Sequence, residues 1–257
     1  MNVFEPFDDR SRPAAADTGT LHGVGLGPGD PDLLTVRAVR IIQSAPAIAY
    51  FAKRGRKGIA RTIVDPWLPT HAEEIPLVYP MTTERHFADP HYVAELGAFY
   101  VEAAETLAAR LGAGLDVALL CEGDPMFYGS FMHLFVRLKA RFPVRMTAGI
   151  SGMSGCWSAA GLPMTWGDDV LTVLPGTLGL DALTERLRAS DAAVIMKLGT
   201  NFSKVRAAVQ AAGLMPRAVY VERGTMAGER IVPLAEMADD RAPYFSMILV
   251  PGEGRRP

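Results

Sequence analysis

Residues 23–31 read GVGLGPGDP, and this run is the clearest guide to how the chain folds. It overlaps an apolar stretch over 21–26, which is predicted to be a strand, and it precedes a helical pattern over 32–44. Asp30 and Pro31 stand where that helix should begin, as an N-cap and a first helical residue. A second turn, CEGDP at 121–125, has the same Gly-Asp-Pro ending. Both turns therefore connect a buried strand to a helix, as in parallel α/β sheets.

The same glycine-rich run argues against a nucleotide-binding loop. In the dinucleotide motif G-x-G-x-x-G, the third glycine lies in the helix, but here that position falls on Pro28 or Asp30. Proline lacks an amide donor, and Asp30 places negative charge where a pyrophosphate would sit. No Gly-Lys-Ser/Thr follows, which excludes a P-loop. Alternating glycines instead indicate that the backbone comes close to another group, in a small-molecule cleft built from main chain.

Composition excludes several classes of function. The net charge is −2 over 257 residues, so nothing attracts nucleic acid or an anionic membrane to the whole chain. No apolar run is long enough to span a bilayer. Cys121 and Cys156 are too few for a disulfide framework and indicate a reducing compartment, the cytoplasm. The five histidines are scattered, so no metal site is expected. Residues 1–19 lack the features of a signal peptide and are expected to form a disordered arm.

Strand and helix patterns alternate along the rest of the chain and predict two α/β domains. The first, residues 20–147, is expected to contain a mostly parallel sheet covered on both faces. The second, residues 148–257, ends in two extended runs, 230–234 and 244–250, with no helix between them, so its sheet is expected to be mixed. The other predicted strands are 47–51, 117–121, 143–147, 170–174, 193–197 and 218–222, and the other predicted helices include 92–111, 131–138 and 153–160.

Three groups of residues resemble the signatures of the tetrapyrrole methyltransferases. They are GLGPGD at 25–30, EGDP at 122–125 with Tyr128-Gly129 behind it, and GIS at 149–151. The resemblance covers roughly residues 20–250 and is closest to the branch that methylates C20 of precorrin-2. The stretches that resemble this branch are IAR at 59–61, PMT at 80–82, DVLTVLPGT at 169–177, MKLGTN at 196–201, YVER at 220–223 and APYFSMILV at 242–250.

The resemblance implies a fold, a cofactor and a set of contacts. Members of this family have two α/β domains with S-adenosylmethionine folded into the cleft between them, and they are usually homodimers. Asp124 and Glu122 could hydrogen-bond the cofactor, or they could serve only as turn and loop carboxylates. The cofactor contacts that the resemblance assigns are Pro28, Glu122, Gly123, Asp124, Phe127, Ser151, Gly152, Lys197, Gly224 and Thr225.

Precorrin-2 carries eight carboxylates, so basic side chains are expected to bind it, preferably as bidentate pairs with arginine. The densest basic group lies just after the second strand, near the sheet edge at which α/β folds bind ligands. A solvated loop would explain the same charges. The residues expected at the substrate are Lys53, Arg54, Arg56, Arg61 and, as part of an apolar wall, Met126.

No catalytic base is predicted. Related uroporphyrinogen methyltransferases carry an acid directly after the tyrosine of the second strand, whereas here Tyr50 is followed by Phe51. The main hypothesis is methylation of precorrin-2 at C20 to give precorrin-3A. The alternatives are the same fold acting on cobalt-factor II, at another ring position, or on protein or RNA, and a non-catalytic tetrapyrrole-binding protein. Negative net charge weakens the RNA alternative, and Pro28 and Asp30 conflict with a dinucleotide oxidoreductase.

Overall fold

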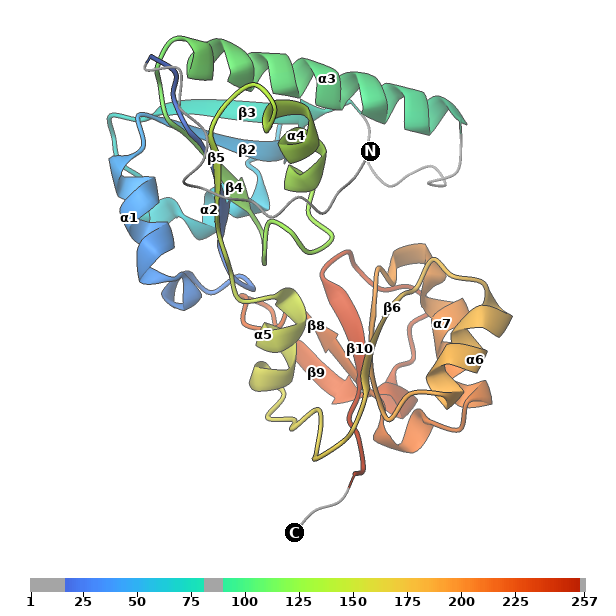
Figure 1. Ribbon diagram of the computed structural model, residues 1–257. Helices are drawn as coiled ribbons and strands as arrows, with labels where there is room; N and C mark the ends of the chain where they lie inside the picture. The colour runs from blue at the N-terminus through green and yellow to red at the C-terminus, as the bar shows by residue number, and fades with distance from the viewer. Residues whose placement is uncertain (1–16, 81–89, 255–257) are drawn as a thin grey trace. The chain divides into compact units, whose positions relative to one another are not determined.

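The computed structural model describes residues 17–80 and 90–254. The chain divides into two compact units, of which the first ends at Ile150 and the second begins at Ser151 (Figure 1). Most of the expected N-terminal arm, and the Met81-Thr82 part of the PMT stretch, lie outside the described residues. Each unit is built around its own five-stranded sheet.

The sheet of the first unit is parallel throughout, which confirms the expectation of a mostly parallel sheet. Its strands lie in the order β3-β2-β4-β1-β5, and every pairing between them is parallel. The edge strand β3 is an addition to the strands that the sequence predicted. The strands are β1 (Leu21–Gly25), β2 (Ala47–Lys53), β3 (Glu73–Tyr79), β4 (Val117–Cys121) and β5 (Val144–Thr147).

Helices cover both faces of this sheet because its strands are apolar on both sides. In β4, Leu119 packs into the core beneath α3 and α4, whereas Leu120 packs into the core beneath α1 and α2. Both leucines are completely buried, as in central strands of parallel sheets. The helices are α1 (Val36–Ser44), α2 (Ile59–Ile63), α3 (Pro90–Gly112) and α4 (Phe131–Leu138).

The prediction of one helix over 32–44 is wrong in its first turn. Asp30 does act as a cap, but of a one-turn 3₁₀ helix, Pro31–Leu33, where its side chain accepts a hydrogen bond from the Asp32 amide. Leu34 is extended, and α1 begins only at Val36. Thr35 caps α1, with its hydroxyl accepting from the Ala38 amide at 3.1 Å. Two capped helices, a one-turn 3₁₀ helix and α1, therefore follow one another where the sequence indicated a single capped helix.

The second unit has a mixed sheet, which confirms the predicted change of pattern. Its strand order is β6-β7-β10-β8-β9; β6 and β7 are parallel, and the remaining pairs are antiparallel. Because β7 and β8 both run antiparallel to β10, their carboxyl ends lie at the same edge of the sheet. The strands are β6 (Leu171–Pro175), β7 (Ala192–Met196), β8 (Val219–Glu222), β9 (Arg230–Pro233) and β10 (Ser246–Val250).

Helices again lie on both faces of the second sheet. α6 (Leu180–Arg188) and α7 (Phe202–Ala211) pack over one face, while α5 (Gly152–Ala159) packs on the other (Figure 1). The strand β10 is buried between them: Ile248 faces α6 and α7, and Leu249 faces α5. Further one-turn 3₁₀ helices are Asp65–Trp67, Gly199–Asn201, Met215–Arg217 and Leu234–Glu236.

Candidate functional site

Three loops of the first unit meet where β1, β4 and β5 end. The backbones of Gly27 and Gly123 exchange hydrogen bonds, with N···O distances of 3.3 Å and 2.8 Å. A Cβ atom on Gly25 would lie 2.5 Å from the amide nitrogen of Gly149, and a Cβ on Gly149 would lie 2.0 Å from the Gly123 carbonyl oxygen. No side chain fits at these contacts. The close approach that the alternating glycines predicted is therefore, at Gly25, an approach to the chain's own loops.

Asp124 joins the same loops through its side chain. One carboxylate oxygen accepts a hydrogen bond from the Met126 amide at 2.8 Å, and the other accepts from the Gly149 amide at 3.1 Å. Asp124 therefore holds its own turn closed and holds the loop after β5 against it. The turn role that the sequence left open is present in the structure, and a cofactor role would be additional to it.

We call residues 122–130 the acidic loop, because Glu122 and Asp124 stand at its start. Its middle presents large apolar side chains: Met126 is 43% exposed, and the half-buried Phe127 packs edge-on against Tyr128 at 4.9 Å between ring centroids. Tyr128 has a positive φ of 54°, a conformation that a bulky side chain adopts only at a cost in free energy. The half-buried Pro28 lies on the facing loop, directly after Gly27.

The predicted contacts of the second unit gather around the ends of β7 and β8 and the start of α5. Ser151 caps α5, and its hydroxyl accepts from the Ser154 amide at 3.3 Å; Gly152 is the first residue of that helix. Gly224 packs tightly on α5, since a Cβ there would lie 2.7 Å from the sulfur of Cys156. Lys197 and Thr225 both have positive φ, 58° and 68°. Backbone strain of this kind is common at binding sites.

Thr225 carries a second unusual feature. Its hydroxyl oxygen is buried and has no hydrogen-bond partner among the described residues, although its amide donates to Glu229 at 2.6 Å. A buried hydroxyl without a partner costs free energy, so a ligand that hydrogen-bonds it would stabilise this loop.

The basic group after β2 divides into two parts. We call residues 53–57 the basic loop. The side chains of Lys53, Arg54 and Arg56 are exposed, and none of them has an ion-pair or hydrogen-bond partner in the described part of the chain. Three cations within four residues, with no partner among residues 17–80 and 90–254, repel one another, so a polyanionic ligand would stabilise this arrangement.

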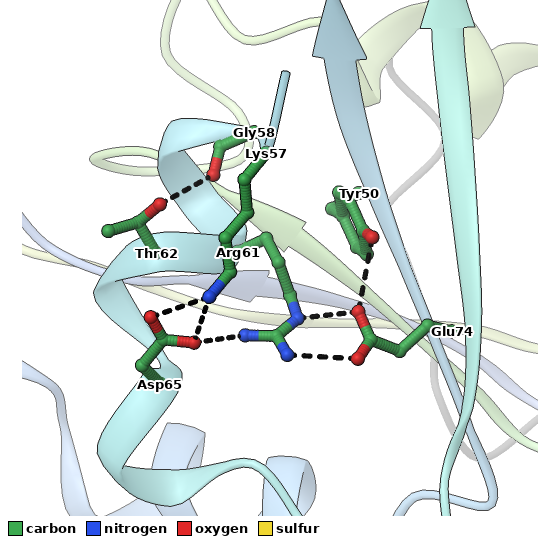
Figure 2. A network of polar contacts seen from close by, with 7 residues as sticks. All are labelled: Tyr50, Lys57, Gly58, Arg61, Thr62, Asp65 and Glu74. Carbon is green, nitrogen blue, oxygen red and sulfur yellow. Dashed lines mark hydrogen bonds and ion pairs between the residues drawn. The ribbon is translucent and has the colours of Figure 1, made fainter. Parts of the chain in front are cut away.

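Arg61 and Lys57 form the other part, a network of ion pairs (Figure 2). The guanidinium of Arg61 binds Glu74 in bidentate fashion, with N···O distances of 2.6 Å and 2.9 Å, and also binds Asp65. Lys57 donates to both oxygens of Asp65 at 2.6 Å and 2.7 Å. Arg61 is only 8% exposed. The carboxylates that Arg61 binds in the structure belong to this chain, and its contact with the substrate stays a prediction.

The charges in this network shift the titration of its acids. The hydrogen bonds from Arg61 hold the pKa of Glu74 below its ordinary value, and those from Lys57 and then Arg61 lower the pKa of Asp65. The Tyr50 hydroxyl donates a further hydrogen bond to Glu74 at 3.1 Å. The network therefore ties α2 to β2 and β3.

A cluster of hydroxyl groups that the sequence did not predict lies beside Phe51. The Phe51 ring stacks on Tyr79 at 5.4 Å between ring centroids. The Tyr79 hydroxyl lies 2.6 Å from the Ser130 hydroxyl, which also accepts from the Tyr100 hydroxyl at 3.1 Å. Burial raises the pKa of Tyr79 strongly, so this phenol stays neutral at physiological pH. The sequence pattern that could have predicted a strand ending at Tyr79 is the alternation of Ile75, Leu77 and Tyr79, which is typical of a half-buried strand.

The described residues hold neither a membrane-spanning helix nor a metal cluster. Residues 17–80 and 90–254 contain no helix whose length and apolar character would let it cross a membrane. The same ranges hold no group of three or more His, Cys, Asp or Glu side chains placed to bind a metal ion. A shallow hollow on α6, lined by Thr184, Glu185 and Arg188, lies at a helix surface and includes none of the predicted site residues.

Comparison with known proteins gives consistent matches along the chain. The family model of the tetrapyrrole (corrin/porphyrin) methylases matches residues 20–238. A precorrin-2 C(20)-methyltransferase from Sinorhizobium sp is 55% identical over 239 residues, which are 93% of this chain and 98% of that protein. A cobalt-precorrin-2 C(20)-methyltransferase from Salmonella typhimurium is 31% identical over 90% of this chain and 96% of that protein.

A solved structure shares the fold. The uroporphyrin-III C-methyl transferase from Thermus thermophilus, in complex with S-adenosylhomocysteine, matches with a TM-score of 0.63 and 22% sequence identity. The match covers 91% of this chain and 92% of that one. The family model spans both units, and both of the sheets expected from the sequence are present. The chain therefore belongs to the tetrapyrrole (corrin/porphyrin) methylases, a family of methyltransferases.

Proposed function

We propose that this protein transfers a methyl group from S-adenosylmethionine to C20 of precorrin-2, giving precorrin-3A in cobalamin biosynthesis. The observation that carries the proposal is the 55% identity to a precorrin-2 C(20)-methyltransferase along 98% of that protein. Identity at this level, without large gaps in coverage, supports the same reaction on the same substrate.

The residues that we propose to bind the cofactor are chemically suited to S-adenosylmethionine. This ligand has ribose hydroxyls, an amino-acid group and an adenine edge, all of which hydrogen-bond to backbone groups and hydroxyls. Thr225 offers a buried hydroxyl without a partner among the described residues. In the first unit we propose Pro28, Gly123, Asp124 and Phe127 as cofactor contacts, together with Glu122 through its main chain; in the second unit we propose Ser151, Gly152, Lys197 and Gly224.

S-adenosylmethionine supplies a methyl group that is already activated by its sulfonium centre. The protein then has to bring the two reactants together in line, which contributes roughly 7–11 kcal/mol to lowering a barrier of this kind. We propose that Lys53, Arg54 and Arg56 bind carboxylates of precorrin-2, because these exposed side chains lack partners among the described residues. Met126 would add apolar contact with the macrocycle. We assign no catalytic base, since Phe51 occupies the position of the acid in related enzymes.

The test is a product analysis. The protein is incubated with methyl-labelled S-adenosylmethionine and precorrin-2, and the labelled carbon is assigned by NMR. We expect label at C20. Label at another ring position would contradict the assignment of this reaction, and tight pigment binding without any transfer would indicate a tetrapyrrole-binding protein instead.

The second candidate is the same methylation of a cobalt-containing substrate. The 31% identical Salmonella relative, named for cobalt-precorrin-2, is the observation that favours it. Competition between precorrin-2 and cobalt-factor II in one assay distinguishes the two, and we expect preference for the metal-free substrate.

We also propose that the protein is a cytoplasmic homodimer. Sedimentation equilibrium tests the dimer, because the monomer has a mass of 27.7 kDa.

A further inference from the structure

The start of α2 lacks a cap of its own. Gly58 occupies the N-cap position, where a serine, threonine or aspartate would normally accept a hydrogen bond from the first helical turn. Glycine is required there because a Cβ would lie 2.2 Å from the carbonyl oxygen of Phe51 in β2. Close packing of the basic loop against β2 thus removes the side chain that could have capped the helix.

The cap is supplied by the acidic loop. The amide of Ala60, in the first turn of α2, donates a hydrogen bond of 3.0 Å to the carboxylate of Glu122, which is 62 residues away in sequence. The strands that precede these loops, β2 and β4, are parallel neighbours, so their carboxyl ends lie side by side. A carboxylate at this place also interacts favourably with the partial positive charge of the helix start.

The other side of α2 is fixed independently. Arg61 binds Glu74 at the beginning of β3 and Asp65 just beyond the helix (Figure 2). The hydrogen bond from Ala60 to Glu122 is therefore a separate contact, which holds the beginning of α2 to the acidic loop.

We propose that Glu122 is a positioning residue that holds the basic loop in place by capping α2. This inference rests on the proposed function: Glu122, the first residue of the acidic loop, also determines the position of Lys53, Arg54 and Arg56. The carboxylate of Glu122 is thereby assigned a role in binding the tetrapyrrole substrate, whereas the sequence motif suggests a role in binding the cofactor.

Hydrogen exchange on the protein without ligands tests the cap directly. In Glu122→Ala, we expect amides of residues 59–63 to exchange about tenfold faster than in the wild type. Glu122→Gln keeps an oxygen that accepts from the Ala60 amide and should restore most of the protection. The control is Glu102→Ala, which removes an exposed carboxylate of α3 and should not alter exchange in α2. Unchanged exchange in Glu122→Ala would overturn the cap.

Steady-state kinetics tests the consequence. We expect Glu122→Ala to raise the KM for precorrin-2 at least fivefold, with kcat changed less than twofold and with calorimetric affinity for S-adenosylhomocysteine within twofold of wild type. Glu122→Gln should recover most of the KM. A tenfold loss of affinity for S-adenosylhomocysteine with an unchanged KM for precorrin-2 would overturn the proposal. If the wild type transferred no methyl group, the proposed function would fail, whereas the exchange result would still report on the cap.

Discussion

The carboxylate of Asp124 accepts hydrogen bonds from two backbone amides, so it stabilises the acidic loop before any ligand binds. Glu122 and Arg61 also have partners within the chain, which are the Ala60 amide and the carboxylates of Glu74 and Asp65. At the residue scale, then, charged side chains that the motif or the composition assigned to ligands act first on the geometry of the loops. Their effects on binding follow from that geometry.

Replacement of Asp124 by alanine should weaken cofactor binding. We expect Asp124→Ala to reduce the affinity for S-adenosylhomocysteine at least tenfold, or about 1.4 kcal/mol, because the Gly149 and Met126 amides lose their acceptor. Isothermal titration calorimetry measures the change. Asp124→Asn keeps one acceptor oxygen and should give an intermediate affinity. If Asp124→Ala bound S-adenosylhomocysteine with wild-type affinity, a role of this carboxylate in cofactor binding would be contradicted.

Loss of Glu74 should destabilise the first unit. Glu74→Ala leaves the buried Arg61 with Asp65 as its remaining carboxylate partner, and we expect a cost of about 1.5–3 kcal/mol for the lost charge-assisted hydrogen bonds, because Glu74 is itself exposed. Urea unfolding at pH 7 measures it. The pKa values of Glu74 and Asp65 are lower in the folded state than in the unfolded state. These carboxylates therefore add to the free energy of unfolding above their unfolded-state pKa values, and the added stability is lost as pH falls through their folded-state pKa values. The difference in unfolding free energy between the variant and the wild type should therefore shrink as pH falls below the ordinary pKa of a glutamate; a constant difference would contradict this account.

At the scale of elements, the loops after β1, β4 and β5 form one backbone cluster because glycine stands at each contact. Gly25, Gly123 and Gly149 come from three different strand ends, and their main chains approach more closely than any side chain permits. Parallel strands place their carboxyl ends at one edge, which is why segments far apart in sequence can meet there. The cluster gives the first unit a preformed surface of main-chain groups.

A methyl group in this cluster should be costly. We expect Gly149→Ala to lower both stability and affinity for S-adenosylhomocysteine, because the added Cβ would lie 2.0 Å from the Gly123 carbonyl oxygen and the loops must separate. The matched control is Gly97→Ala in α3, where the added Cβ has no atom within 4 Å. The Gly97→Ala variant should have a free energy of unfolding that is roughly 0.5–1 kcal/mol higher than that of the wild type, because alanine has a higher helix propensity than glycine. Thermal unfolding and calorimetry measure both variants, and equal effects would contradict the steric argument.

At the scale of the whole molecule, each unit has its own sheet with buried cores on both faces. One cysteine lies in each unit: Cys121 ends β4, and Cys156 lies in α5. Both are buried, and burial raises the pKa of Cys121 and raises that of Cys156 to about 11. Each thiol can therefore report on the unfolding of its own unit.

Thiol labelling should be slow in the folded protein and should follow unfolding. At pH 8, we expect neither cysteine to react appreciably with iodoacetamide, because both thiols are buried and protonated. In a urea series, labelling at Cys121 should report unfolding of the first unit, and labelling at Cys156 should report unfolding of the second. Peptide mass spectrometry assigns the two sites. Rapid native labelling at either cysteine would contradict its burial.

The sequence by itself determined most of the strands and the longer helices, a mostly parallel first sheet, a mixed second sheet and the family, because hydrophobic periodicity and glycine-rich turns are local signals. It also placed the basic loop directly after β2. It did not predict β3 or the short helix α2. Tertiary structure alone decided which cations pair with carboxylates of this chain: Arg61 meets Glu74 only because β3 lies beside β2. It likewise decided that Glu122 caps α2 and that Gly25 faces Gly149. These contacts join segments distant in sequence, and the order of strands in the sheet, which no local pattern encodes, brings them together.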